Sequence, residues 1–217
     1  AVIFGITLST LHQSGLGALF LMAKDKIHPL FYSEFIPIMF FVSSIFAGLS
    51  MVIFEGSISQ KVFSDQISKT DHKAHYSIIN SLSKICAVTM FAYFTLNVLV
   101  FIHEKRWGLL NTPMGYWYLT EMVGFVLLPM ILFFMSYRKR NITLIKVASV
   151  MTMLGVIINR LNISVIGFKW DSVNHYYPSW MEITVTLAVI FTEIWIFRWV
   201  IRRMPVLRED PEWKNEN

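Results

Sequence analysis

The chain has 217 residues, of which 55% are hydrophobic and 15% charged, and its mean hydropathy is +0.53. This composition excludes an ordinary soluble domain, because the apolar residues come in blocks of about 20, long enough to cross a bilayer as helices. The net charge of +5 does not indicate nucleic-acid binding, since the basic residues gather at the ends of the apolar blocks.

Six apolar segments are predicted to be transmembrane helices: 1–23, 34–54, 76–102, 116–137, 142–167 and 180–201. Only helices satisfy the backbone polar groups over such lengths in lipid. We therefore expect an all-α, polytopic transmembrane helix bundle.

The polar stretch Ser9–Gly17 lies in the middle of the first predicted span. His12 and Gln13 are costly at that depth, and polar side chains there usually face the bundle interior or a water-filled cavity. Small or polar residues recur every four positions from Gly5 to Gly17, on a face where a neighbouring helix could approach closely.

Lysine and arginine are unequally distributed between the two sets of connections. Eleven lie in the second connection, the fourth connection and the C-terminal segment, against five in the other connections. Because these residues are enriched in cytoplasmic loops, we expect the C-terminus in the cytoplasm and the other loops outside.

The predicted outer loops are short and aromatic, at residues 28–35, 107–118 and 169–180. Trp and Tyr in such places are typical of the interfacial belt of a membrane protein. They would also suit a docking surface for an extrinsic partner, because aromatic residues are enriched in protein interfaces.

Several polar residues are predicted at membrane depth toward the outer face. Arg160 stands out because a guanidinium cannot deprotonate and needs a carboxylate, carbonyl groups or water nearby. Glu121 and Glu182 lie at similar depth on neighbouring spans, together with Asn159 and Asn162. Two interpretations stay open, an ion pair that holds helices together and a ligand site.

Lys84, Lys146 and Glu193 are predicted nearer the inner face. Glu193 shares a face of the last span with Glu182, so these carboxyls and the two lysines could form part of a proton path. The alternative is that the lysines only extend their ammonium groups to the inner headgroups.

A haem inside the membrane would need two axial ligands at matching depth. His12 is central in its span whereas His103 is terminal, so the two do not match. We expect no haem and no metal site in this chain, since His72 and His75 lack a third ligand and Cys86 is the single cysteine. Motifs for nucleotide binding or hydrolysis are absent from the sequence.

Five ordered motifs carry a resemblance to a known family. They are S-T-L-H-Q-S-G-L-G-A-L-F from Ser9, H-P-L-F-Y from His28, M-V-I-F-E-G from Met51, N-R-L-N-I-S from Asn159 and Y-Y-P-S-W-M-E from Tyr176. On these motifs the chain resembles the NrfD/PsrC family of polysulfide reductase membrane subunits, which react with quinone. Within it, the chain is similar to the HybB-type branch, the "cytochrome b" subunits of nickel–iron hydrogenases.

The resemblance implies an integral membrane subunit of a respiratory redox complex in the bacterial inner membrane. Such a subunit exchanges electrons between an iron–sulfur or multihaem cytochrome partner on the outer, periplasmic face and membrane quinone (menaquinone or ubiquinone), in some members coupled to proton movement. The alternative is a structural membrane anchor, with the chemistry in partner chains.

The family fold is a protein of eight to ten helices arranged as two four-helix bundles. Residues 1–23 would be the last helix of the first bundle and 24–167 the second bundle. Residues 168–217 would then form an outer aromatic loop, a closing helix and a cytoplasmic tail. Because the chain starts without Met inside an apolar run, we expect further helices before it.

Our leading hypothesis places a quinone or proton site between the bundles. His12 and Gln13, with Ser9, would line it. Arg160 and Glu182 would order its outer end, with Asn159 and Glu121 as further candidates, and Glu193, Lys84 and Lys146 are the candidates for a proton path.

Overall fold

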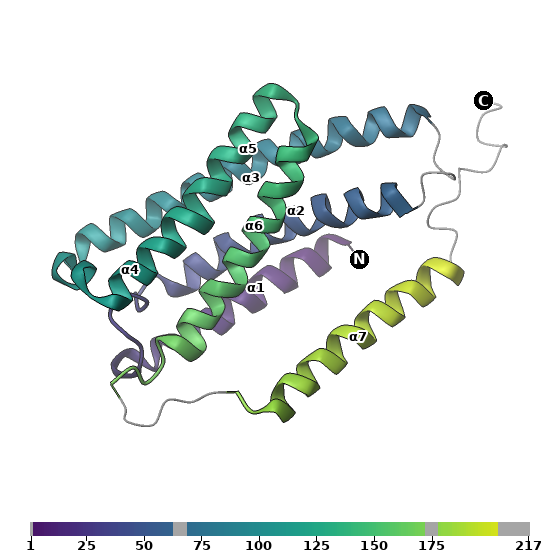
Figure 1. The fold of residues 1–217 in the computed structure, drawn as a ribbon. Helices are drawn as coiled ribbons and strands as arrows, with labels where there is room; N and C mark the ends of the chain where they lie inside the picture. Colours follow the sequence, from purple (N-terminus) through teal and green to yellow (C-terminus); the bar gives the residue numbers. More distant parts are fainter. Residues whose placement is uncertain (1, 63–68, 172–177, 204–217) are drawn as a thin grey trace. The chain divides into compact units, whose positions relative to one another are not determined.

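The computed structural model describes residues 2–62, 69–171 and 178–203. In these ranges the chain forms helices and no β-strand, which confirms the predicted all-α fold (Figure 1). The elements are α1 (Val2–Leu21), η1 (Lys24–Lys26), α2 (Ile36–Val62), α3 (Lys69–His103), η3 (Trp107–Asn111), α4 (Pro113–Thr120), η4 (Glu121–Leu127), α5 (Leu128–Lys139), α6 (Ile142–Leu161), η5 (Asn162–Ile166) and α7 (Trp180–Arg203).

The chain divides into two compact units, Ala1–Val173 and Asn174–Asn217. Helices α1 to α6 belong to the first unit and α7 to the second. Helix α7 therefore belongs to a different unit from the other described helices.

Within the described ranges, five helices are long and apolar enough to cross a membrane: Ile36–Gln60, His75–His103, Pro113–Lys139, Ile142–Ile166 and Trp180–Val200. They match five of the six predicted spans closely. The sixth, α1, forms a helix of 20 residues but is not among the five.

Two helices extend further than the sequence suggested. The loop predicted at residues 56–75 is partly helical, because α2 continues to Val62 and α3 already begins at Lys69. Hydropathy marks the part of a helix that lies in lipid, and polar residues can continue the same helix into water.

Local sequence explains where the other helices start. Thr112 caps α4, since its side chain accepts from Gly115 N (3.1 Å), and Pro113 occupies the first turn, where no backbone donor is needed. Arg140 takes a left-handed conformation (φ 50°) between α5 and α6. Asn141 then caps α6 by accepting from the backbone N–H of Thr143 (3.0 Å) and of Leu144.

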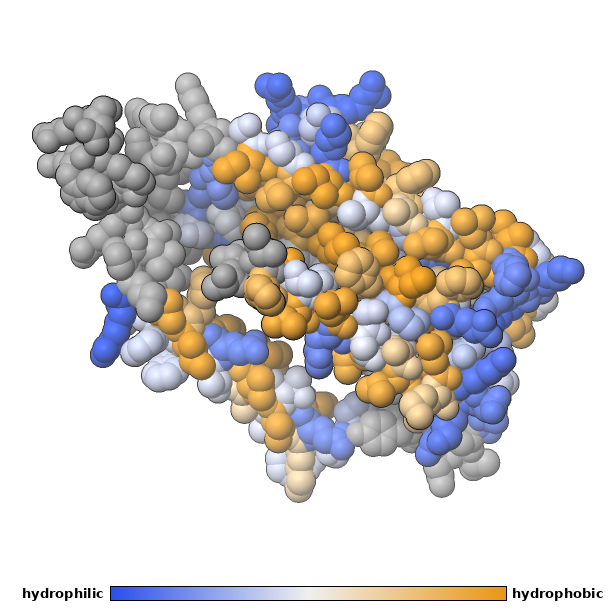
Figure 2. All heavy atoms as spheres, turned by 180° about the vertical axis from the view of Figure 1, so that it is seen from behind, coloured by the Kyte–Doolittle hydropathy of each residue, from blue (hydrophilic) through white to orange (hydrophobic). Residues whose placement is uncertain are grey.

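Helices α2, α3, α5 and α6 pack around a mainly apolar core. The core includes Cys86, Met90, Phe133, Ile145 and Ala148, all 0% exposed. On the face that Figure 2 shows, hydrophobic side chains also cover much of the surface, as expected where lipid replaces water.

Helix α1 packs against α2 at a single small residue. A Cβ on Gly17 would lie 2.9 Å from Pro37 Cα and 3.1 Å from Phe40 Cβ, so only glycine allows this approach. Of the two glycines on the predicted close-approach face, only Gly17 contacts a neighbouring helix closely, since nothing lies within 4 Å of a Cβ placed on Gly5.

At one end of the first unit, segments 22–35 and 167–171 are joined; we call this the loop end. Ile27 and Phe168 form an isolated antiparallel bridge, and His28 N donates to Gly167 O (2.7 Å). The His28 ring packs edge-on against Trp170 at 4.8 Å between centroids. These contacts hold the start of α2 next to the end of α6.

Candidate functional site

The most elaborate polar arrangement inside the first unit centres on Glu121, which is 3% exposed. Its Oε1 accepts from Asn159 Nδ2 (2.7 Å), and its Oε2 accepts from Asn162 Nδ2. Glu121 follows Pro113 by eight residues, which places it about 12 Å from that end of its span. A carboxyl at this depth is stable only when such donors satisfy it.

Further donors fix the orientation of both amides. Arg160 Nη1 donates to Asn159 Oδ1 (3.0 Å), and Trp117 Nε1 donates to Asn162 Oδ1 (2.8 Å). Each asparagine must therefore present its NH2 group to Glu121. We call these five residues the Glu121 network.

The Arg160 guanidinium is itself held on two sides. Nη2 donates to Ser43 Oγ (2.7 Å), and the group lies 3.5 Å from the centre of the Phe40 ring. The predicted ion pair therefore takes an indirect form, because Asn159 bridges Arg160 and Glu121. The cationic group is stabilised by a ring face as well as by hydrogen bonds.

Both helices that carry the network contain a π-helical segment. Glu121 is the first residue of η4 and Asn162 the first of η5. A Cβ on Gly155 would lie 2.8 Å from Phe125 O, so α6 and η4 approach closely just below the network. Such segments are rare and are frequently found at functional sites.

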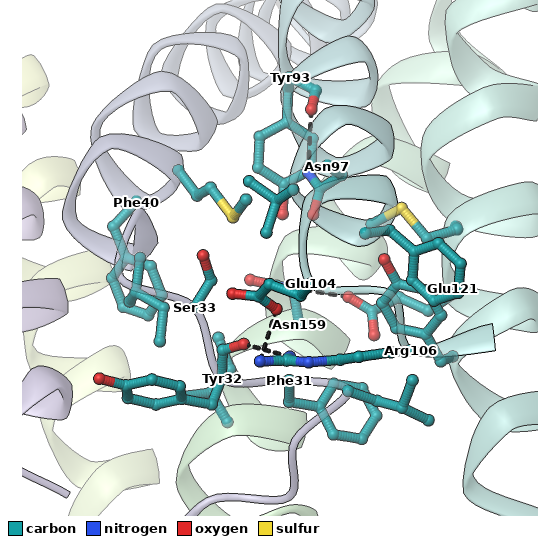
Figure 3. A pocket seen from close by; sticks show the side chains of 18 residues that line it. Phe31, Tyr32, Ser33, Phe40, Tyr93, Asn97, Glu104, Arg106, Glu121 and Asn159 are labelled. Carbon is teal, nitrogen blue, oxygen red and sulfur yellow. Dashed lines mark hydrogen bonds and ion pairs between the residues drawn. The ribbon is translucent and has the colours of Figure 1, made fainter. Parts of the chain in front are cut away.

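A cavity lies beside the network, and residues of the loop end form part of its lining (Figure 3). Tyr93 and Asn97 line one end of it, whereas Tyr32 and Arg106 line the other, and Glu121 lies along its wall. Its space for water-sized molecules is about 40 Å³. That is enough for about three water molecules and far less than a quinone ring requires.

Two charged residues, Glu104 and Arg106, line the cavity on the side of the loop end. Glu104 and Arg106 form an ion pair (2.5 Å) with side chains 18% and 17% exposed, and Arg106 Nη1 donates to Tyr32 O (2.6 Å). Burial raises the pKa of Glu104, although Arg106 opposes this shift. Sequence reasoning missed these residues, because loop residues reveal no partner before the fold is known.

The predicted site residues of the first span are distant in sequence from the Glu121 network, and their side chains are more exposed than that of Glu121. Ser9 and His12 are exposed on α1, and Gln13 is half-buried. Their assignment to a quinone site stays a prediction.

The predicted proton-path residues belong to different elements: Lys84 to α3, Lys146 to α6 and Glu193 to α7. Lys84 and Lys146 are exposed, and the Lys84 ammonium lies 5.7 Å from the centre of the Tyr137 ring. Lys146 lies four residues from the start of α6, which fits the interpretation in which its ammonium group extends to the headgroups, whereas Lys84 lies nine residues inside the span His75–His103. Glu193 lies in the middle of α7, within the second unit.

Glu182 takes part in a capping box at the start of α7. Its Oε2 accepts from Ser179 N (3.1 Å), and its own N–H donates to Ser179 Oγ (3.4 Å). This reciprocal pair satisfies two of the free donors at a helix start. The sequence signal was present as S-x-x-E immediately before an apolar run.

In the part of the chain that the structure describes, no three His, Cys, Asp or Glu side chains come close enough together to hold a metal ion. His72 falls where side chains are not described.

Comparison with known proteins identifies relatives over nearly the whole chain. It is 42% identical over 215 residues to a protein of Nitratidesulfovibrio vulgaris (strain Hildenborough), covering 98% of this chain and 55% of that protein. It is 24% identical over 208 residues to the "Probable Ni/Fe-hydrogenase 2 b-type cytochrome subunit" of Escherichia coli (strain K12), covering 95% and 52%. The chain thus spans about half the length of these relatives.

No solved structure matches the chain. The family model described as "Polysulphide reductase, NrfD" matches residues 1–169, a region that contains the whole Glu121 network. This match confirms the resemblance seen in the five sequence motifs: the chain belongs to the polysulphide reductase NrfD family of multi-pass integral membrane proteins.

Proposed function

We propose that this chain is part of a membrane subunit of a respiratory redox complex, and that the subunit exchanges electrons between an extrinsic iron–sulfur or multihaem partner and membrane quinone. Membership of the NrfD family and the likeness to a protein named as a hydrogenase b-type cytochrome subunit support this proposal. The observation that carries it is the Glu121 network, because a bundle that served only as an anchor would not need an interlocked carboxylate and guanidinium at membrane depth.

We assign quinone contact to α1 rather than to the cavity. The cavity fits only about three water molecules, whereas His12 and Gln13 lie on an accessible face of α1. A quinone needs hydrogen-bond partners for its two carbonyl oxygens and a proton carrier, and an imidazole can donate a hydrogen bond and carry a proton.

The proposed topology rests on the charge distribution. Lysine and arginine are more numerous in the connections at 55–75 and 138–141 and in the C-terminal segment than in the other connections, which supports a loop end that faces the periplasm and a C-terminus in the cytoplasm of a bacterial inner membrane. The redox partner would dock on the aromatic loops, which include Trp107, Tyr116 and Trp170 with exposed rings.

The test is quinone-linked turnover of the assembled complex with His12→Ala and Gln13→Ala. We expect His12→Ala to slow quinone turnover by about 10²-fold, while oxidation of the donor with an artificial acceptor stays unchanged. Thr10→Ala is the matched control, since the Thr10 hydroxyl is already bonded to Ile6 O and Thr7 O of its own helix. Unchanged quinone turnover in both variants would contradict the assignment.

A structural anchor is the second candidate function. Two hydrogen bonds favour this function, from His28 N to Gly167 O and from Arg106 Nη1 to Tyr32 O. They order the loop end whether or not this chain takes part in any reaction. Variants at these positions that abolish assembly without altering turnover of the assembled complex would support the anchor.

A further inference from the structure

Lys84 lies at the membrane boundary of α3, at the end of the bundle that carries the α5–α6 turn. The 18 residues from Ile85 to Ile102 include no charged side chain and extend over about 27 Å, close to the thickness of a ~30 Å hydrocarbon layer. The Lys84 ammonium lies 5.7 Å from the centre of the Tyr137 ring, and Tyr137 is two residues from the end of α5 at Lys139. The ammonium is therefore level with the end of α5, near the depth of the lipid headgroups.

A second cation lies on the neighbouring helix at the same end. Helices α3 and α5 pack against each other, and Arg138 follows Tyr137 directly. The Arg138 guanidinium lies 5.8 Å from the centre of the Phe134 ring, so its side chain is directed back along α5 toward the membrane. Lys84 and Arg138 are both exposed, and a ring face supplies only part of the compensation that a cation needs.

The neighbouring chain offers these two cations no carboxylate. Neither residues 72–103 nor residues 128–150 contain Asp or Glu. Among the residues that the structure describes, no carboxylate lies within ion-pair distance of Lys84 or Arg138. The second of these segments carries three further exposed cations, Lys139, Arg140 and Lys146. This end of the bundle therefore presents positive charge that favours an anion from the surroundings.

Exposed apolar side chains continue from each cation toward the middle of the membrane. On each helix they lie four and seven positions further into the span, on the face of the cation: Val88 and Phe91 on α3, Phe134 and Ile131 on α5. We call these four residues the apolar stripes. A charged end followed by exposed apolar surface matches the order of groups in an anionic phospholipid, from phosphate to acyl chains.

From this arrangement we infer that the seam between α3 and α5 binds an anionic phospholipid, whose phosphate accepts hydrogen bonds from Lys84 and Arg138 and whose acyl chains lie along the apolar stripes. An ammonium and a guanidinium both donate to phosphate oxygens, and such charge-assisted bonds are strong. The stripes select a lipid over free phosphate, because only a lipid brings apolar chains. The inference goes beyond the proposed function and does not depend on where quinone binds.

The charge requirement can be measured with phosphatidylglycerol as the probe. The lipid is titrated into the delipidated complex in detergent, and bound molecules are counted by native mass spectrometry. Lys84→Gln and Arg138→Gln each remove one charge and keep a polar side chain. We expect each variant to raise the apparent Kd of the tightest-bound phosphatidylglycerol about fivefold, and the two together about 25-fold.

Lys24→Gln is the matched control, because it removes the same charge from an exposed lysine at the loop end. It should leave the Kd unchanged, and phosphatidylcholine should bind the unmodified complex more weakly than phosphatidylglycerol. An unchanged Kd in Lys84→Gln and Arg138→Gln would overturn the inference. An equal rise in Lys24→Gln would also overturn it, because net charge alone would then account for binding.

The position of the lipid can be tested without changing the protein. Phosphatidylglycerol with a photoreactive group in one acyl chain is crosslinked to the intact complex, and the modified peptides are identified. We expect crosslinks in residues 85–91 and 131–138, whereas crosslinks confined to other segments would overturn the inference. Excess inorganic phosphate should not displace the lipid. Displacement by inorganic phosphate would indicate a site for free phosphate and would refute the assignment to a phospholipid.

Discussion

Glu121→Gln is the most direct perturbation of the Glu121 network, because it keeps the shape of the side chain and replaces one oxygen by an NH2 group. Asn159 and Asn162 both present NH2 groups to this position, and they cannot turn over while Arg160 and Trp117 occupy their oxygens. The glutamine must therefore place one NH2 group against another.

The structure sets the size of the effect. One hydrogen bond to a charged acceptor is lost, worth about 1.5–3 kcal/mol, and two buried donors face each other unsatisfied. Hydrogen bonds between transmembrane helices are weaker on average, about 0.6 kcal/mol in double-mutant cycles. We expect Glu121→Gln to lower the free energy of unfolding by about 2 kcal/mol, seen as a fall of several degrees in the melting temperature of the purified complex.

A second substitution should restore the pattern. In Glu121→Gln with Asn162→Asp, the new carboxylate accepts from Trp117 and from the Gln NH2 group, while the Gln oxygen still accepts from Asn159. Asn162→Asp alone sets two carboxyls against each other and should be destabilising. The double variant should therefore be more stable than either single variant by about 1 kcal/mol or more. Additive losses in the double variant would refute the reasoning.

Three further predictions concern other parts of the chain. Gly17→Leu should lower the free energy of unfolding by about 1–3 kcal/mol, because the larger side chain overpacks against Phe40. The same variant should weaken disulfide crosslinking between cysteines placed in α1 and α2, and undiminished crosslinking would contradict this prediction. Burial, with a smaller contribution from Arg106, lowers the pKa of His28 from 6.5, so the contribution of His28 to stability is complete above pH 6.5 and falls as the pH drops below that value. His28→Asn should therefore flatten the plot of melting temperature against pH below pH 6.5. An unchanged slope in this variant would contradict the prediction. Glu182→Ala should speed amide exchange in the first turn of α7 by removing a cap worth about 1 kcal/mol, whereas equal exchange rates would exclude that role.

The sequence predicted the spans well, because hydropathy and length are properties of a segment by itself. It also grouped Glu121, Asn159, Arg160 and Asn162 by depth, since rise per residue converts position along a helix into distance from its end. Depth does not specify which faces meet. The bridging of Arg160 and Glu121 by Asn159 therefore required the packing of α6 against η4.

Other features had no sequence signal of their own. Trp117 was assigned to an aromatic belt, but its indole N–H holds Asn162 in place. The π-helical segment at Asn162 has no proline beside it, so only the tertiary contacts reveal it, whereas the segment at Glu121 ends two residues before Pro129, which cannot donate a hydrogen bond to the preceding turn. On the side of the loop end, the cavity is lined by Arg106 and Tyr32, which form a hydrogen bond although they are 74 positions apart in the sequence.

The pairing of Ile27 with Phe168 has a consequence for biogenesis. The segment before α2 leaves the ribosome long before the segment after α6, so this end of the bundle cannot close until α6 has been synthesised and inserted. Contacts so distant in sequence are slow to form, because the intervening chain must be ordered first. Closure of the Ile27–Phe168 bridge is therefore a late step, which can follow only after α6 has been synthesised and inserted.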